Sequence, residues 1–189
     1  MNLLLVRHGE IPSNINKVYA GHSPERLTLR GENQASVVAG ELKHHNICAL
    51  YTSPVERAIQ TAQIIGQIIG KDVVVENSFR EIEMGPWEGM SEMDIAQKDP
   101  EAWALWNKEP AELKLARRET LDDLLQRVLT GVRKISHDMS GQRVVIVTHV
   151  AIIRVLMLWW SRKSLNLYKT IHVPNAKIFG ITTDRSPLL

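Results

Sequence analysis

The sequence predicts an α/β protein, a three-layer α/β/α sandwich with a mainly parallel sheet and a small helical cap. Short, continuous apolar runs alternate with segments of helical periodicity for most of the chain. This pattern is typical of parallel strands covered by helices on both faces. The length of 189 residues fits one domain, 1–189. A composition of 44% hydrophobic and 23% charged residues excludes disordered, collagen-like and coiled-coil proteins.

Five short apolar runs are predicted as strands, because they are continuous and too short for helices. They are 3–6, 49–52, 73–75, 144–147 and 178–182. The first run ends in Arg-His-Gly, which indicates a buried strand followed by a loop. The fourth run is the clearest strand of the set.

Helical periodicity places helices between these strands. One helix is expected over 31–45, and Ser-Pro opens another over 53–70. A longer amphipathic helix is predicted over 120–136, with Thr120 as its N-cap and Asp123 as the third residue.

The stretch 86–119 is more irregular and more polar than the rest, and it is predicted as a cap over one end of the sheet. Within it, 94–107 resembles two short helices broken at Pro100. Trp103 and Trp106 are spaced as one helix face, which favours packing within the cap over a platform for substrate.

Two further pairs of residues have competing interpretations. Arg117 and Arg118 form a basic pair that is expected on a solvated face, or in this cap against an acidic substrate. Trp159 and Trp160 end an apolar helix, which indicates a core or a subunit contact. The second alternative would make the protein a homodimer.

Charge and cysteine content narrow the function classes. The net charge of +2 gives no reason to expect nucleic acid or an anionic membrane as partner. The single cysteine, Cys48, excludes an intrachain disulfide and is expected as a buried strand thiol in a cytoplasmic protein.

Arg7 and His8 end the first apolar run too early for a signal peptide. Polar residues interrupt 144–160, so it is predicted as a buried strand and helix, not a membrane span.

Two predicted strands end in histidine, in the sequences Val-Arg-His8 and Val-Thr-His149. Ligands of open α/β sheets bind beyond the carboxyl ends of the strands. Each histidine alone is most simply a polar rim residue, but two at one rim with Arg7 indicate a pocket. Arg57 lies in the first turn of its helix, where the dipole disfavours a cation unless an anion is bound nearby.

Four segments carry a resemblance to a known family. They are LVRHGE, TSPVERAIQTA, REIEMGPWEG and VVIVTHVAIIR, and their order spans nearly the whole chain. The sequence resembles the histidine phosphatase superfamily, in its phosphoglycerate-mutase-like branch. The resemblance implies a phosphohistidine intermediate on His8 and Glu81 as proton donor. It also implies a phosphate pocket, which consists of Arg7, Asn14, Arg57 and His149.

The chemistry of these residue types supports the same roles. A histidine nucleophile must be neutral, and neighbouring arginines would lower the pKa of His8. His149 can donate to a phosphoryl oxygen, so neither a metal nor a cofactor is expected. The arginines would also lower the pKa of Glu81 in the free enzyme, until a bound phosphate offsets them. Glu10, Glu83 and Glu88 are alternative acids, and Glu81 could instead be a solvated partner of Arg80.

The leading functional hypothesis is a phosphomonoester phosphatase acting on a small phosphorylated metabolite. The alternatives are a cofactor-dependent phosphoglycerate mutase and a non-catalytic module that binds a phosphorylated ligand. The loop 18–24 resembles α-ribazole-phosphate phosphatases of cobalamin synthesis, which implies α-ribazole 5′-phosphate as substrate and Gly21 and His22 as substrate-binding residues. Alternatively, the loop is a general turn in which Gly21 serves the backbone geometry.

Overall fold

The computed structural model describes residues 1–136, 139 and 141–182, and within them the predicted α/β class is confirmed. Five strands form one sheet in the order β3-β2-β4-β1-β5. They are β1 (Asn2–Arg7), β2 (Ile47–Thr52), β3 (Val73–Val75), β4 (Arg143–Thr148) and β5 (Ile178–Thr182). The sheet is parallel except for β5, which pairs antiparallel with β1.

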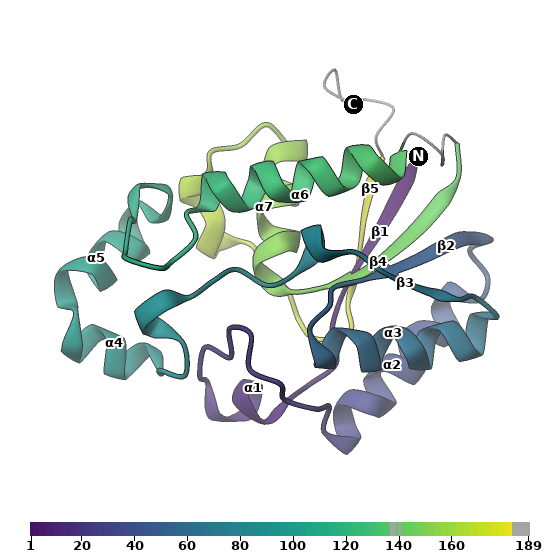
Figure 1. Ribbon diagram of the computed structural model, residues 1–189, viewed down its shortest axis with the longest axis horizontal. Coiled ribbons are helices and arrows are strands. Elements are labelled where there is room, and N and C mark those ends of the chain that lie inside the picture. Colours follow the sequence, from purple (N-terminus) through teal and green to yellow (C-terminus); the bar gives the residue numbers. More distant parts are fainter. Residues whose placement is uncertain (137–138, 140, 183–189) are drawn as a thin grey trace.

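Helices cover both faces of the sheet, as predicted (Figure 1). On one face lie α6 (Leu121–Ser136) and α7 (Val150–Trp160), and on the other α2 (Leu29–Leu42) and α3 (Glu56–Ile69). Alternate residues of β4 point to opposite layers, with Val144 and Ile146 packed toward α6 and α7 and the next residues toward α2 and α3. The sheet is therefore buried on both sides, which explains its continuous apolar strands.

The helix boundaries follow from local capping. Thr120 caps α6, since its Oγ accepts from the amide of Asp123 at 3.1 Å. At α2 the helix begins earlier than predicted because Thr28 Oγ1 accepts from the amide of Gly31. It also ends earlier, at Leu42, so the predicted end at residue 45 is wrong.

The cap contains α4 (Glu92–Lys98) and α5 (Pro100–Lys108), which meet at the predicted break. Asp99 closes α4 and caps α5 by accepting from the amide of Ala102. Trp87 contacts Trp103 and Trp106 edge-on, each at 6.2 Å between ring centroids. The tryptophans therefore pack the cap, and Trp106 also lines the cavity described below.

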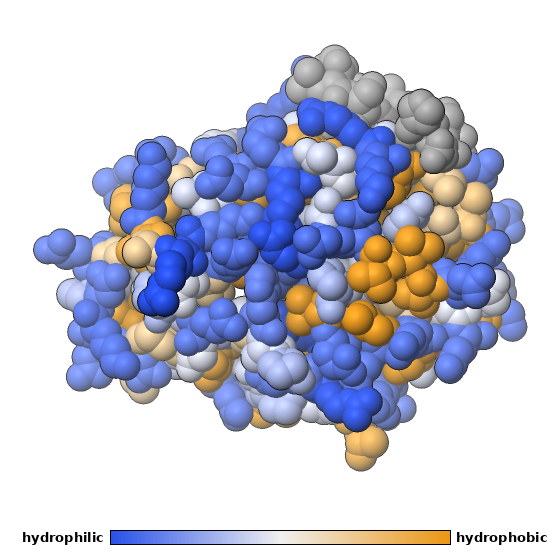
Figure 2. Space-filling view, viewed as in Figure 1, coloured by the Kyte–Doolittle hydropathy of each residue, from blue (hydrophilic) through white to orange (hydrophobic). Residues whose placement is uncertain are grey.

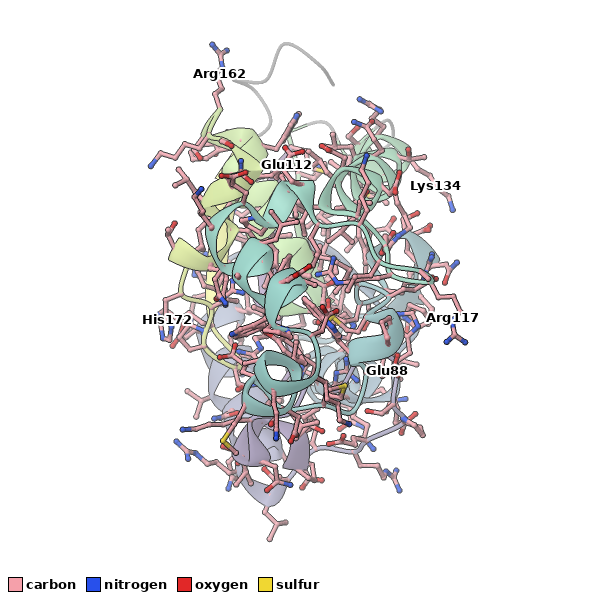
Figure 3. All side chains as sticks on the ribbon, turned by 90° about the vertical axis from the view of Figure 1, so that its left-hand side faces the viewer. Glu88, Glu112, Arg117, Lys134, Arg162 and His172 are labelled. Carbon is pink, nitrogen blue, oxygen red and sulfur yellow. The ribbon has the colours of Figure 1, made fainter. Side chains whose placement is uncertain are left out.

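The Arg117–Arg118 pair divides between two environments. Arg117 is exposed and points away from the ribbon (Figure 3). Arg118 is buried, with its guanidinium 4.3 Å from the ring centroid of Trp106 and 5.3 Å from that of Trp87. The prediction of a solvated face is thus wrong for Arg118, because cation–π contact with two indole rings holds it inside.

Cys48 is exposed, so its prediction as a buried thiol is wrong. The pairing of β2 with β4 shifts register between Ile47 and Ala49. This bulge interrupts the regular alternation of side chains, and it leaves Cys48 on the surface with its Sγ 3.9 Å from Met139 Sδ.

Polar side chains cover most of the face shown in Figure 2, with an apolar patch over β3 and α3. This region contributes the partly exposed Ile68, Val74 and Val75 at the edge of the sheet.

At the end of α7, Trp160 is partly exposed and donates to the Thr182 carbonyl. Within the described ranges, every helix is too short or too polar to cross a lipid bilayer.

Candidate active site

The carboxyl ends of β1 and β4 bring the two predicted histidines together. These strands pair in register up to Arg7 and Thr148, and the His8 amide donates to the Thr148 carbonyl at 2.9 Å. The rings of His8 and His149 lie 5.3 Å apart between centroids. Both rings are buried, so their hydrogen bonds to protein groups determine which nitrogen carries the proton.

The hydrogen bonds of His8 leave the free electron pair of its ring on Nε2. Its Nδ1 lies 2.7 Å from the Gly9 carbonyl, which can only accept, so Nδ1 carries the proton. Nε2 accepts from Arg57 Nε at 3.2 Å. Burial lowers the pKa of His8 well below its ordinary value, and Arg57 and then Arg7 lower it further. The arginines act in the predicted direction, but burial is the larger cause.

Arg57 is fixed by the loop that precedes α2. Its terminal nitrogens donate to the carbonyls of Gly21 at 2.7 Å and Ser23 at 3.2 Å. Arg7 donates from Nη1 to the Val173 carbonyl at 2.6 Å, and its buried Nε has no partner among the described groups. Burial lowers the pKa of Arg7 to about 10, so both it and Arg57 remain cations that can attract an anion at neutral pH.

Ser53 contacts the second histidine, and the sequence analysis missed it. Ser53 Oγ lies 2.7 Å from His149 Nε2 and accepts from the amide of Val55 at 3.2 Å. This arrangement favours donation from the hydroxyl to Nε2, which leaves the proton of a neutral His149 on Nδ1. Burial, followed by Arg57, lowers the pKa of His149 and keeps the ring neutral. A hydroxyl directly after a strand at the same rim was the available signal.

Nδ1 of His149 is buried without a hydrogen-bond partner in the described part of the chain. It lies 4.0 Å from Glu81 Oε2. The two histidines thus offer opposite groups to a molecule placed between them, an electron pair on His8 and an N–H on His149.

Glu81 is buried in the same pocket, so its interpretation as a solvated partner of Arg80 is wrong. Arg80 instead pairs with Glu83 at 3.0 Å. Burial raises the pKa of Glu81 against the opposing effects of Arg57 and Arg7. The arginines act in the predicted direction, but the expected net lowering of this pKa in the free protein is wrong, because loss of hydration outweighs them.

Asn14 lies beside the site with its amide nitrogen available. Its Oδ1 accepts from the amide of Ile11 at 3.2 Å and from Asn175 Nδ2 at 2.9 Å. Asn175 also donates to the His8 carbonyl at 3.0 Å, so one side chain ties Asn14 to the His8 backbone. The Nδ2 group of Asn14 can therefore donate toward the pocket.

A cavity of about 750 Å³ extends from Arg7 and Asn14 toward the cap. The cavity lining does not include Gly21 or His22, the two predicted substrate-binding residues. The Gly21 carbonyl holds Arg57, and His22 Nε2 lies 2.7 Å from the Glu81 carbonyl. His22 also lines a separate cavity of about 340 Å³. The structure therefore places both residues as supports of Arg57 and Glu81.

The described residues contain no group of three or more His, Cys, Asp or Glu side chains able to hold a metal ion. The pocket instead combines two guanidinium groups, two imidazoles and a carboxyl of raised pKa. Such a set can bind a tetrahedral dianion, attack it from His8 Nε2 and supply a proton from Glu81.

Comparison with known proteins places this arrangement in a family. The model of the histidine phosphatase superfamily (branch 1) matches residues 3–187. The chain is 31% identical over 156 residues to phosphoserine phosphatase 1 from Hydrogenobacter thermophilus, covering 82% of this chain and 74% of that protein. It is 29% identical to the adenosylcobalamin/alpha-ribazole phosphatase of Salmonella typhimurium, covering 83% and 78%.

A solved structure, Bacillus stearothermophilus YhfR, matches with a TM-score of 0.91 at 29% identity, over 97% of this chain and 92% of that one. The chain spans 43% of the length of the first curated relatives that it matches, three mycobacterial proteins. The match of the family model nevertheless runs over almost all of this sequence. The chain belongs to the histidine phosphatase superfamily, branch 1.

Proposed function

We propose that the protein is a phosphomonoester phosphatase that acts through a phosphohistidine on His8. One observation carries the proposal: the nucleophilic Nε2 of His8 is fixed by the Gly9 carbonyl, opposite the unpartnered N–H site of His149 and beside Arg57. A non-catalytic module that binds a phosphorylated ligand would need only the positive charges of Arg7 and Arg57. The fixed proton positions and the raised pKa of Glu81 favour catalysis.

In the first step His8 Nε2 attacks phosphorus, and the bond to the ester oxygen breaks. Arg57 turns its Nε donor from His8 to the phosphoryl group, which Arg7, Asn14 and His149 also contact. The leaving oxygen takes its proton from Glu81. In the second step the Glu81 carboxylate takes a proton from water, whose oxygen attacks phosphorus. The P–N bond then breaks and inorganic phosphate leaves.

For the substrate we propose a small phosphorylated metabolite, and α-ribazole 5′-phosphate is one candidate. The loop 18–24 and the name of the Salmonella relative support it. The contacts of Gly21 and His22 weaken the argument from the loop, since both can be explained by the placement of Arg57 and Glu81. A turnover panel of phosphate esters that includes α-ribazole 5′-phosphate tests this part of the proposal.

Phosphate release is expected to exceed isomerisation when the protein is given 3-phosphoglycerate with a bisphosphoglycerate primer. Water must reach phospho-His8 in a phosphatase, whereas a mutase must retain its product for rephosphorylation. The measurement compares inorganic phosphate with 2-phosphoglycerate in one time course. Isomerisation that clearly outpaces release would establish the mutase alternative.

Replacing Ser53 with alanine is expected to lower kcat about fivefold, because a hydrogen bond worth about 1 kcal/mol no longer selects the Nδ1–H form of His149. Nitrogen-15 NMR of the histidines reports the tautomer directly. Ser36→Ala is the matched control, since Ser36 donates only to the Glu32 carbonyl on the surface of α2. An unchanged His149 tautomer in Ser53→Ala would contradict this role of Ser53.

A further inference from the structure

The cavity beside the site carries more positive charge than a phosphate needs. Among the described residues that line it, Glu92 is the single carboxylate, and four side chains are cationic. These are Arg7, Lys17, Arg154 and Lys169. Arg7 belongs to the proposed phosphate pocket, so the other three lie where the alcohol part of the ester would extend.

Arg154 is the most constrained of these additional cations. Its Nε donates to the Ile171 carbonyl at 2.9 Å, and its guanidinium lies 4.9 Å from the ring centroid of Tyr168. No carboxylate within the described ranges pairs with it. The Arg154 side chain also forms a hydrogen bond with Tyr168, and the terminal nitrogens of its guanidinium form a planar fork that matches the two oxygens of a carboxylate.

Lys169 lies on the same wall, in the 3₁₀ helix Leu165–Thr170. Its Nζ donates to Asn107 Oδ1 and lies 4.4 Å from the ring centroid of Trp103. Burial lowers the pKa of Lys169, Glu92 opposes this, and a smaller repulsion from Arg154 lowers the pKa further. Arg154 and Lys169 are therefore close enough to repel each other, and an anion bound between them would relieve that repulsion.

Glu92 does not remove this excess of positive charge. Its Oε1 accepts from the Tyr19 hydroxyl at 3.0 Å, and its side chain is exposed at the rim. One exposed carboxylate balances at most one of the three additional cations.

We propose that the substrate carries a carboxylate on the alcohol part of the ester, and that Arg154 and Lys169 bind it. This inference rests on the proposed phosphatase function and narrows its substrate class. A carboxylate-bearing ester, such as a phosphorylated hydroxy acid, would place its phosphate between His8 and His149 and its second anion against the cap. A nucleoside phosphate such as α-ribazole 5′-phosphate presents no such group.

The test uses two esters that differ at one carbon, 3-phosphoglycerate and glycerol 3-phosphate. Wild-type kcat/KM is expected to favour the carboxylate ester by about 10–100-fold, the usual worth of charge-assisted hydrogen bonds. Lys169→Met should reduce this ratio by about tenfold, and Lys169→Arg should restore much of it. Lys163→Met is the matched control, because Lys163 is exposed beyond α7 and does not line the cavity.

Binding to His8→Ala, measured by calorimetry with the same two esters, separates this inference from the proposed function. Tighter binding of 3-phosphoglycerate without phosphate release from either ester by wild-type protein would refute the phosphatase and keep the carboxylate site. Release from both esters with a ratio near one would refute the carboxylate site alone. A ratio that Lys169→Met leaves at the wild-type value would also overturn it.

Discussion

His8→Ala is expected to abolish formation of a phosphoenzyme and to lower phosphate release by at least about 10³-fold, since no other group replaces a lost nucleophile. Wild-type protein quenched during turnover should carry phosphate that is labile in acid and stable in alkali, as a phosphoramidate is. The variant should carry none. The structure makes this test sharp because the Gly9 carbonyl holds the proton on His8 Nδ1 and leaves Nε2 as the one ring nitrogen with a free electron pair.

His44→Ala is the matched control for this experiment, because His44 is exposed after the end of α2 and precedes β2, at the opposite end of that strand from the rim. It should label and turn over as the wild type does. His149 lies next to His8 and is itself neutral and buried, so it is the main competitor for the nucleophilic role. Acid-labile phosphate that persists in His8→Ala would transfer the role to His149.

Much of the pocket could be predicted from the sequence because strand ends are local features. Val-Arg-His8 and Val-Thr-His149 each combine a buried strand with a polar terminus, and parallel pairing places such termini at one rim. The prediction that Arg57 lies in the first turn of its helix likewise depended only on where that helix begins. These inferences required the order of the strands, but no side-chain packing.

Other features depended on packing between distant segments, which periodicity does not encode. Arg118 looks solvated in sequence, yet the indole rings of Trp87 and Trp106 enclose it. Cys48 lies in an apolar run, but a bulge places it outside. Lys169 reaches the cavity only because its 3₁₀ helix packs against the cap.

The pKa of Glu81 also depends on packing that the sequence does not reveal. The sequence indicates the cations near it, and their sign of effect on its pKa is correct. The sequence does not indicate how deeply Glu81 is buried. Burial is the larger cause, so the net shift of the Glu81 pKa is upward. The difference matters for the proposed chemistry, since a carboxyl of raised pKa can already hold its proton before a substrate binds.

Glu81→Gln is expected to slow phosphorylation of His8 by an alkyl phosphate about 10²–10⁴-fold, the usual worth of a positioned proton donor. An alkoxide leaving group needs that proton as the ester bond breaks. An aryl phosphate leaves as a stable phenolate, so the same step should slow much less. The glutamine keeps the acceptor for the Ile82 amide, which binds Glu81 Oε1 at 2.9 Å, so the loop geometry is retained.

The same variant should show a burst of phenol release with the aryl ester, because hydrolysis of phospho-His8 lacks its base. The pH profile gives an independent readout. Burial raises the pKa of Glu81, so the wild-type rate with an alkyl ester should persist above the ordinary carboxyl range and fall only as pH rises through the raised value. Glu81→Gln should lack that alkaline limb.

Rapid-quench measurement of the phosphorylation step with both esters decides the role of Glu81. Glu83→Gln is the matched control, since Glu83 is exposed and pairs with Arg80 at 3.0 Å, away from the buried pocket. Equal losses for the alkyl and aryl esters in Glu81→Gln would remove it from the acid role. Glu10 is not a suitable replacement, because its carboxylate is already engaged: it accepts from the Thr28 hydroxyl and lies 3.5 Å from Arg30. Glu81, a buried carboxyl 4.0 Å from His149 Nδ1, is therefore the group that we expect to supply the proton.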